Sequence, residues 1–310
     1  MSKGFTADDV GAQTGRRFLV TGANAGLGFE TARVLAARGG HVVLACRDAG
    51  RAEAAMARIR ADVPAAELSF QPLDLADLDQ VREAAQTVLA GPRLDVLINN
   101  AGVMIPPETL TKQGYELQFG VNHLGTFAFT GLVHGHVDDR IVITGSIAHR
   151  NGAMDYSDLS ASRSYHNWSR YQMSKLANLL HMFELDRRLS AAGRATQAIG
   201  AHPGVALTEL TRHLPLPLRT MTPLAGPFFN SAAQGAWPTL QAATGARVQG
   251  GDYLGPQGLG EVSGRSGPAR ASRDARDPKL ARELWARSID LTGVDPGMRI
   301  LNFSGIFFRQ

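Results

Sequence analysis

Short apolar runs alternate with longer segments of helical periodicity along the first two-thirds of the chain. The runs are rich in Val, Ile and Leu with little polar alternation, which is typical of strands buried on both faces. Strands are predicted over residues 17–21, 41–46, 68–73, 94–99, 139–144 and 196–202. Their alternation with helices is typical of βαβ units, so the pattern predicts an α/β fold with a parallel sheet.

Helices are predicted between and after these strands, over residues 28–38, 51–62, 78–89, 171–189 and 278–291. Within the segment 78–89, Leu78, Val81, Ala85 and Val88 fall on one side of the helix. This spacing is that of an amphipathic helix with one face toward a core.

The chain changes character after residue 203. Residues 203–230 contain five prolines among Leu, Met and Phe. Proline breaks helix interiors, so we expect a lid or pocket wall here, the alternative being an irregular surface loop. The Gly-, Ser- and Arg-rich residues 255–278 are expected to form a loose surface excursion that opens a C-terminal extension over 255–310. The sequence does not indicate a function for the apolar tail 300–310.

Composition narrows the class of protein. The chain of 310 residues is 44% hydrophobic and 19% charged, which is ordinary for a soluble globular protein. We expect a single domain over residues 1–310, a size at which much of the surface can be buried. The net charge of +4 comes from dispersed arginines, which argues against nucleic acid as a partner.

The number of cysteines and the distribution of apolar residues help to predict the cellular compartment of the protein. The single cysteine, Cys46, excludes a disulfide framework and a multi-thiolate zinc site. The polar N-terminus has no signal-peptide pattern, and no run approaches the ~20 apolar residues of a membrane-spanning helix. We therefore expect a cytoplasmic protein with no transmembrane segment.

A glycine-rich turn follows the first predicted strand and precedes the first helix. It runs from Thr21 to Gly28 as TGANAGLG, with Asn24 at its centre. Such a turn lets backbone N–H groups approach a pyrophosphate at a helix N-terminus. Gly22 permits the tight turn and Gly26 the close approach, whereas Gly28 permits close packing of helix on strand. The alternative is a purely structural turn.

The end of the second strand predicts which dinucleotide is bound. An acidic residue there accepts from the ribose 2′-OH of NAD, whereas an arginine accommodates a 2′-phosphate. The chain has Cys46 followed by Arg47, which favours NADP(H), with NAD(H) as the open alternative. Arg47 could instead be an exposed charge, with Asp48 capping the next helix.

Tyr171 and Lys175 lie four residues apart in a predicted helix, so both project from the same face. Tyrosine has an ordinary pKa near 10 and is a weak base at neutral pH. A neighbouring ammonium favours the phenolate, as proton exchange with an alcohol or ketone requires. The same spacing also occurs by chance in exposed helices.

Taken together, the motifs resemble those of the short-chain dehydrogenase/reductase family. They are TGxxxGxG at 21–28, NNAG at 99–102, Ser146, YQMSK at 171–175 and HPG at 202–204, in this order over residues 15–254. The strings ACRD at 45–48, YQMSKLANL at 171–179, YLGPQGLGE at 253–261 and LARELW at 280–285 resemble its retinol-dehydrogenase-like branch. The resemblance implies a Rossmann-type, doubly wound, mostly parallel sheet of seven strands with helices on both faces.

The resemblance also assigns roles at the reaction centre. It implies that Tyr171 is the general acid/base and that Ser146 hydrogen-bonds the substrate oxygen. Lys175 would hold the nicotinamide ribose and lower the pKa of Tyr171, and Asn122 would support a water-linked proton relay through that lysine. Ser146 precedes Tyr171 by 25 residues, a longer gap than in the simplest members, so residues 147–168 are interpreted as an insertion.

The remaining roles concern the cofactor. Asp74 would accept from the adenine amino group. Other positions that match the family's cofactor-binding segments are Leu27, Leu75, Asn100, Ala101, Gly102, Pro203, Gly204, Val205 and Thr208.

Two competing site interpretations are weaker. Tyr165, next to Ser164, lacks a lysine four residues later that could activate it. His134, His136 and His149 have no accompanying carboxylate cluster, so no metal site is predicted.

We therefore expect an NADP(H)-dependent oxidoreductase that moves a hydride between nicotinamide and a carbonyl or alcohol carbon. Apolar side chains in 203–230 favour an apolar substrate, such as a retinoid- or steroid-like compound; they are Leu214, Leu216, Leu218, Met221, Phe228 and Phe229. The alternatives are a reductase of carbon–carbon double bonds of the protochlorophyllide-reductase type and a dinucleotide-binding sensor or scaffold. The family implies a homodimer or homotetramer, although the C-terminal extension could cover that surface.

Overall fold

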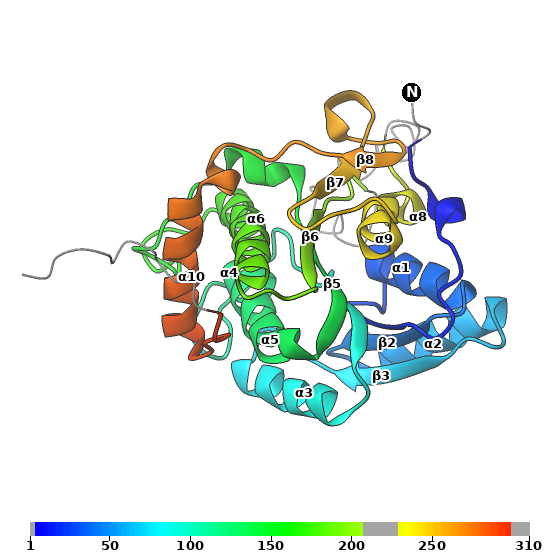
Figure 1. Cartoon of the computed structure of the whole chain (residues 1–310). Coiled ribbons are helices and arrows are strands. Elements are labelled where there is room, and N and C mark those ends of the chain that lie inside the picture. Colours follow the sequence, from blue (N-terminus) through cyan, green and yellow to red (C-terminus); the bar gives the residue numbers. More distant parts are fainter. Residues whose placement is uncertain (1–3, 207–228, 299–310) are drawn as a thin grey trace, which may run out of the picture.

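The structure is a computed structural model that describes residues 4–206 and 229–298 (Figure 1). Its sheet has eight strands in the order β3-β2-β1-β4-β5-β6-β7-β8. The strands are β1 (Arg17–Thr21), β2 (His41–Cys46), β3 (Leu68–Pro72), β4 (Leu94–Asn99), β5 (Val137–Thr144), β6 (Gln197–Ala201), β7 (Tyr253–Pro256) and β8 (Ser266–Pro268). The first seven pair in parallel and β8 pairs antiparallel with β7, which confirms the mostly parallel sheet.

The eighth strand corrects the expected count of seven and the expected loose excursion over 255–278. β8 has only three residues, Ser-Gly-Pro, and so lacks the apolar run by which the other strands were predicted. Backbone hydrogen bonds hold it in place: Gln257 N donates to Arg265 O at 2.8 Å, and Phe5 N donates to Ser266 O at 2.8 Å. The excursion is therefore tied to the sheet edge and to the N-terminal segment.

Helices cover both faces of the sheet. The α-helices of the described residues are α1 (Gly26–Ala37), α2 (Ala49–Asp62), α3 (Leu78–Ala90), α4 (Leu117–Phe119), α5 (Thr126–Val133), α6 (Asn167–Ala191), α8 (Ala232–Gly235), α9 (Trp237–Thr244) and α10 (Pro278–Thr292). A π-helix, η2 (Gly120–Gly125), joins α4 to α5. Short 3-10 helices are η1 (Ala7–Asp9), η3 (His134–His136), η4 (Ile147–Asn151), η7 (Leu259–Glu261) and η8 (Asp274–Arg276).

The two faces of the sheet have separate hydrophobic cores. On one face α1, α2 and α9 pack on alternate strand residues, and on the other face α3, α5, α6 and α10 do so. Both groups are visible on opposite sides of the sheet in Figure 1. The sheet is thus buried on both faces, as its continuous apolar strands predict.

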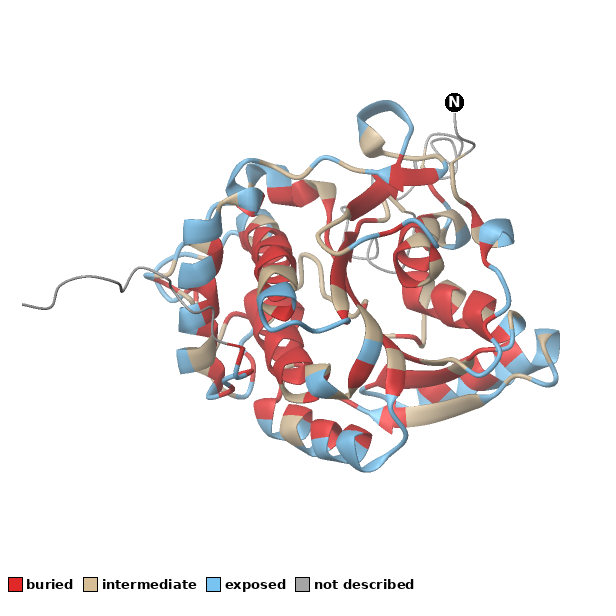
Figure 2. Cartoon of the chain, in the orientation of Figure 1, coloured by how far each residue is buried: buried red, intermediate tan, exposed pale blue. Residues whose placement is uncertain are grey.

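The helix α6 is buried on nearly its whole circumference. One side packs on β6 and β5, and α10 lies along another side (Figure 1). Figure 2 shows α6 coloured almost entirely as buried, whereas the outer side of α10 is exposed. The buried charge of Glu184 in this layer is paired: its carboxylate accepts from Arg187 at 2.6 Å and from Arg188 at 2.8 Å. α10 therefore shields the helix that carries Tyr171 and Lys175.

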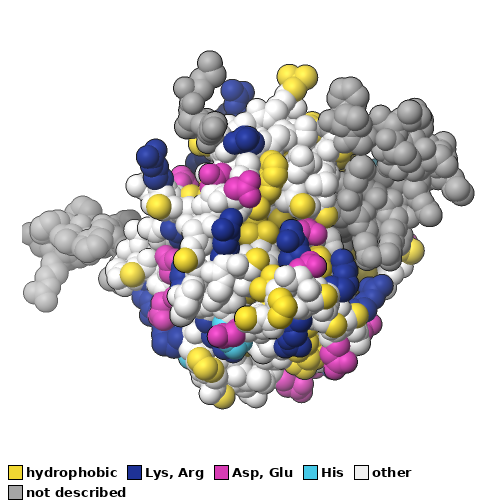
Figure 3. All heavy atoms as spheres, turned by 90° about the vertical axis from the view of Figure 1, so that its right-hand side faces the viewer, with side chains coloured by type: hydrophobic (Ala, Val, Ile, Leu, Met, Phe, Trp, Pro, Cys, Tyr) yellow, Lys and Arg dark blue, Asp and Glu magenta, His cyan; other side chains and the backbone are white. Residues whose placement is uncertain are grey.

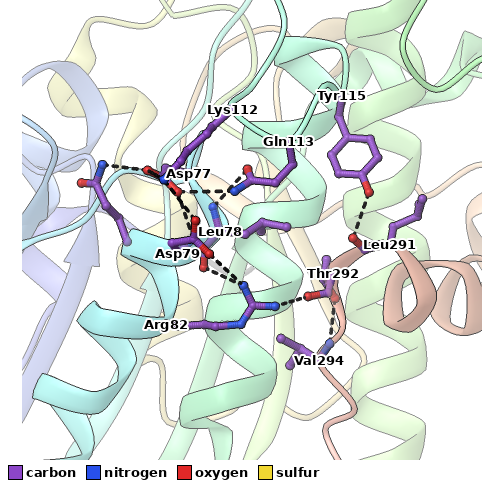
Figure 4. Close-up of polar contacts among 11 residues, drawn as sticks. Asp77, Leu78, Asp79, Arg82, Lys112, Gln113, Tyr115, Leu291, Thr292 and Val294 are labelled. Carbon is purple, nitrogen blue, oxygen red and sulfur yellow. Dashed lines mark hydrogen bonds and ion pairs between the residues drawn. The ribbon is translucent and has the colours of Figure 1, made fainter.

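Polar contacts fasten the C-terminal end of α10 to the rest of the molecule (Figure 4). The Arg82 guanidinium donates to Thr292 O at 2.5 Å, and the Tyr115 hydroxyl donates to Leu291 O at 2.9 Å. Beside them, Lys112 donates to Asp77, the residue that caps α3, at 3.1 Å. The start of α3, the segment before α4 and the end of α10 are thereby joined.

Two surface properties follow from the described residues. None of their helices combines the length and the apolar character needed to cross a membrane. On the face drawn in Figure 3, basic side chains are interspersed with acidic and apolar ones and do not form one large basic patch.

Two histidines are buried where α5, α6 and α10 meet. His181 packs against Phe127 and Trp285, with ring centroids 5.2 and 5.8 Å away. His123 lies 5.8 Å from His181 and contacts Ser288 Oγ at 2.7 Å. Burial lowers the pKa of His181 from 6.5 to about 3, so this imidazole is neutral in the folded protein at neutral pH.

This burial predicts acid sensitivity that can be assigned to His181. Between pH 6.5 and 3 the unfolded chain binds a proton at this residue that the folded chain does not, so stability falls as the pH falls. We expect a loss of about 2 kcal/mol between pH 7.5 and pH 5 from this residue. Urea unfolding followed by circular dichroism at pH 7.5 and 5 should show a smaller difference for His181→Leu than for wild type. An equal difference, or the same reduction in the control His136→Leu, would contradict the assignment.

Candidate active site

The glycine-rich turn between β1 and α1 has the geometry that the sequence predicts. Gly22 and Gly26 have φ of +67° and +55°, a region that side chains rarely adopt. A Cβ on Gly28 would lie 2.5 Å from Gly22 O, so only glycine lets α1 approach the turn this closely. Among the described residues no side chain caps the α1 N-terminus, whereas aspartates cap α2, α3 and α10. This end of α1 is suited to an anion.

A hydrogen-bonded link joins the ends of β1 and β4 beside the turn. The Asn100 amide donates to Thr21 O at 2.9 Å. Thr21 Oγ1 accepts from Asn100 N at 3.0 Å and from Ala101 N at 2.9 Å. In a sheet of this order, the switch point between β1 and β4 is where ligands bind.

A cavity of about 450 Å³ opens at this switch point. Most of the cofactor-binding residues that the sequence predicts line it: Thr21, Gly22, Asn24, Gly26, Leu27, Gly28, Arg47, Asp74, Leu75, Asn100, Ala101 and Gly102. Asp74 Oδ1 accepts from Ala76 N at 2.9 Å, which fixes the carboxylate at the cavity wall. Glycine turn, uncapped helix end and cavity together fit a nicotinamide dinucleotide.

The residues that could distinguish NADP(H) from NAD(H) lie at the end of β2, along the same cavity. Arg47 is exposed there, and Asp48 caps α2 by accepting from Arg51 N at 2.9 Å. Arg51, which the sequence analysis did not single out, also lines the cavity. Cys46 is buried at the end of β2, and this burial raises the pKa of its thiol to about 11. The thiol is therefore a poor nucleophile.

Asn122 lies in the π-helix η2, an element often found at functional sites. Its side chain is fully buried and accepts from Val103 N at 2.7 Å. The Asn122 amide also donates to Val103 O and to Ser174 Oγ, each at 2.9 Å. Asn122 thus joins the segment after β4 to α6, and its role in a proton relay stays a prediction.

Ser146, Tyr171 and Lys175 come together at the ends of β5 and α6. The Ser146 hydroxyl lies close to that of Tyr171. Lys175 Nζ donates to Thr144 O at 3.2 Å and lies 5.8 Å from the centroid of the Tyr171 ring. All three predicted side chains therefore share one small, buried volume.

Burial dominates the protonation of this group. It raises the pKa of Tyr171, while the neighbouring Ser146 hydroxyl opposes the rise. Burial also lowers the pKa of Lys175 to about 8. The lowering of the Tyr171 pKa that the resemblance implies through Lys175 is thus smaller in the protein alone than the effect of burial.

A second cavity of about 370 Å³ adjoins the first, and Leu27 and Met104 line both. Ser146 and Tyr171 lie in its wall together with Pro203, Gly204 and Val205. Several of its other lining residues were not predicted from the sequence. Ile105, Ile147 and Ala148 lie in segments without periodicity, and Trp168 lies in the first turn of α6, before the predicted helix start at residue 171. Trp168 is 42% exposed, and its ring centroid lies 5.8 Å from that of Tyr171.

The competing residues have other partners. The Tyr165 hydroxyl donates to Pro106 O at 2.8 Å, and His149 is bonded to Ser146 O and Ser272 N. In the part of the chain that the structure covers, His, Cys, Asp and Glu do not gather in threes as a metal ion would need. Thr208, the tail 300–310 and residues 207–228 of the expected lid lie outside the described residues.

Comparison with known proteins identifies relatives along nearly the whole chain. The model of the family described as short chain dehydrogenase matches residues 16–216. Retinol dehydrogenase 13 of Homo sapiens is 40% identical over 299 residues, covering 92% of this chain and 87% of that protein. Polyprenol dehydrogenase of Mus musculus is 39% identical over 297 residues, covering 92% and 86%.

Solved structures agree with this result. An uncharacterized protein from Mycobacterium Paratuberculosis is 39% identical, with a TM-score of 0.80 over 94% of this chain and 99% of that one. A short chain dehydrogenase from Burkholderia cenocepacia, solved in complex with NADP, is 25% identical with a TM-score of 0.62. It covers 78% of this chain and 96% of its own.

The packing at Gly28 predicts that Gly28→Ala weakens dinucleotide binding. The added Cβ would collide with Gly22 O, so α1 and the turn must move apart. We expect the Kd for NADPH, measured by nicotinamide fluorescence, to rise at least about tenfold. Gly11→Ala is the matched control, because a Cβ there meets nothing within 4 Å. Unchanged binding in Gly28→Ala would show that the turn does not hold the cofactor.

Proposed function

Because the chain belongs to the short-chain dehydrogenase/reductase family of NAD(P)-dependent CH–OH oxidoreductases, we propose that it transfers a hydride between NADP(H) and an apolar carbonyl or alcohol. The observation that carries this proposal is the common wall of the two cavities. Leu27 and Met104 line both, and Ser146 and Tyr171 lie on the far side of that wall. A substrate in the second cavity is thereby next to a cofactor in the first.

When bound, the nicotinamide supplies a hydride acceptor or donor at its C4 carbon. The chain supplies the proton and the positioning. Ser146 and Tyr171 lie near each other in the wall of the second cavity, so one substrate oxygen there can accept from both hydroxyls. Tyr171 then gives its proton to the oxygen during reduction, or takes it during oxidation.

Lys175 contributes positive charge to this buried volume. Its lowered pKa, about 8, leaves most molecules protonated at pH 7. During reduction, Lys175 in its charged form stabilises the negative charge that develops on the substrate oxygen and on Tyr171. Because Tyr171 and Lys175 are buried, this stabilisation is stronger than it would be in solution.

The second cavity favours an apolar substrate. Its lining beyond Ser146 and Tyr171 is mostly apolar, with Met104, Ile105 and Trp168 on one side. Two of the relatives are named as dehydrogenases of retinol and of polyprenol, and both compounds are alcohols with long apolar chains. We infer a retinoid- or polyprenol-like alcohol, or its aldehyde, as the substrate class.

Two alternatives are less well supported. A carbon–carbon double-bond reductase of the protochlorophyllide-reductase type would be expected to use a cysteine in the substrate cavity, but Cys46, the single cysteine, lies at the far end of the cofactor cavity. A sensor without turnover would be expected to lack a catalytic group, and Asn122, Ser146, Tyr171 and Lys175 are all present.

The proton transfer predicts the effect of Tyr171→Phe. Removing the hydroxyl should lower kcat by about 10²- to 10⁴-fold and leave NADPH binding intact. Turnover would be followed at 340 nm with all-trans-retinal, a polyprenal, a steroid ketone and a hydrophilic sugar as substrates. Tyr165→Phe should keep wild-type activity. Full activity in Tyr171→Phe would remove Tyr171 from the mechanism.

The proposed preference for NADP(H) predicts that substituting Arg47 affects NADPH and NADH differently. Arg47→Ala should raise the KM for NADPH about tenfold or more, because a charge-assisted contact with the 2′-phosphate is lost, and should barely change the KM for NADH. Arg51→Ala tests the neighbouring guanidinium, and Arg60→Ala at the other end of α2 is the control. Equal effects on NADPH and NADH would contradict a role for Arg47 in this preference.

A further inference from the structure

His149 is a fully buried imidazole directly behind the candidate active site. It lies in η4, three residues after Ser146. Its Nδ1 is 2.5 Å from Ser146 O, and its Nε2 is 3.0 Å from Ser272 N. The ring therefore joins the turn that carries Ser146 to the C-terminal extension.

The two contacts fix the tautomer of His149. A backbone N–H only donates, so Nε2 must be the unprotonated, accepting nitrogen toward Ser272. Nδ1 then carries the proton and donates it to Ser146 O. Burial lowers the pKa of His149 to about 4, so the imidazole is neutral at neutral pH, as this arrangement requires.

A second connection runs parallel to the first. The Arg150 guanidinium donates to Glu261 Oε2 at 2.5 Å, and His202 Nε2 contacts the same oxygen at 3.0 Å. His202 Nδ1 accepts from Gly204 N at 3.2 Å, so its Nε2 is the donor to Glu261. Glu261 thereby links the Ser146 side of the substrate cavity to the Gly204 side.

Glu261 is held in an uncommon backbone conformation. Its φ is +61°, directly after Gly260 with φ +63°, and a non-glycine residue rarely occupies this region. Arg270 N donates to Glu261 Oε1 at 3.0 Å, in addition to the contacts from Arg150 and His202. Such strain persists where the surroundings over-determine it, often next to functional sites.

The Tyr253 ring fills the space between the two histidines. Its centroid lies 5.6 Å from that of His149 and 5.2 Å from that of His202. A Cβ on Gly145 would lie 3.1 Å from the Tyr253 hydroxyl, so the backbone before Ser146 rests on this ring. The Ser146 turn is thus supported from behind by ring packing and by hydrogen bonds.

We propose that His149 is a positioning residue that holds Ser146 in place for the substrate oxygen by donating from Nδ1 to the Ser146 carbonyl, while Ser272 N fixes the tautomer that makes this donation possible. This rests on the proposed function, because Ser146 is the hydroxyl that would bind the oxygen. Displacing that hydroxyl by a fraction of an ångström should impair turnover more than nucleotide binding.

The test separates the two nitrogens of His149. In His149→Asn the amide nitrogen can replace Nδ1 and donate to Ser146 O, whereas in His149→Gln the amide can replace only Nε2. We expect His149→Ala and His149→Gln to lower kcat about tenfold or more, His149→Asn to recover most of the loss, and the NADPH Kd to stay within about twofold throughout. His136→Asn is the control and should behave as wild type.

Wild-type kcat in folded His149→Gln, or equal losses in His149→Asn and His149→Gln, would overturn the proposal. Nitrogen-15 NMR of the histidine rings gives a readout that does not depend on activity. A proton on Nδ1 of His149 is expected, and a proton on Nε2 would overturn the inference. A wild-type protein that binds NADPH but reduces none of the substrates would count against the proposed function, and the NMR result would still decide the tautomer.

Discussion

The enclosure of α6 between the sheet and α10 is the packing on which the candidate site depends. Tyr171 and Lys175 project from this helix toward the ends of β5 and β6, and their positions are only as fixed as the helix is. Lys175 Nζ and the Asn178 amide both donate to Thr144 O, at 3.2 and 3.1 Å, which ties the helix to the end of β5. α10 packs along another side of this helix, and Tyr171 and Lys175 are both buried.

Much of the fold can be predicted from the sequence, because strands of a parallel sheet have a recognisable apolar pattern. β1, β2 and β4 begin and end at the predicted residues, since a strand buried on both faces is a continuous apolar run. The segment from α4 to α5 was missed for a related reason: it is buried on nearly all sides and contains Gly120, Gly125 and Gly131, so no amphipathic period marks it. α9 was missed because Pro238, which favours a helix start, reads as a breaker when the start is unknown.

The candidate site, like the fold, has a part that could be predicted from the sequence and a part that could not. Many residues that line the first cavity lie in turns at strand ends, where glycine, asparagine and aspartate have specific backbone and capping requirements, so their spacing can be recognised. The substrate cavity is built from irregular segments whose residues need only be apolar and correctly placed. Ile105 is an example: its φ of +52° is unusual for a β-branched residue, and Gln118 Oε1 accepts from its backbone N at 2.9 Å. Only the folded chain brings such a residue to the cavity.

Burial acts on Tyr171 and Lys175 in opposite directions and thereby couples them. It raises the pKa of the phenol and lowers that of the ammonium, so each charged form is costly when it is alone. A phenolate and an ammonium in the same buried volume offset each other's cost, because opposite charges attract more strongly where the effective dielectric constant is low. Tyr171 can therefore release its proton most readily while Lys175 keeps its own. The ionisation of the pair, and not that of tyrosine alone, is what the enclosure of α6 controls.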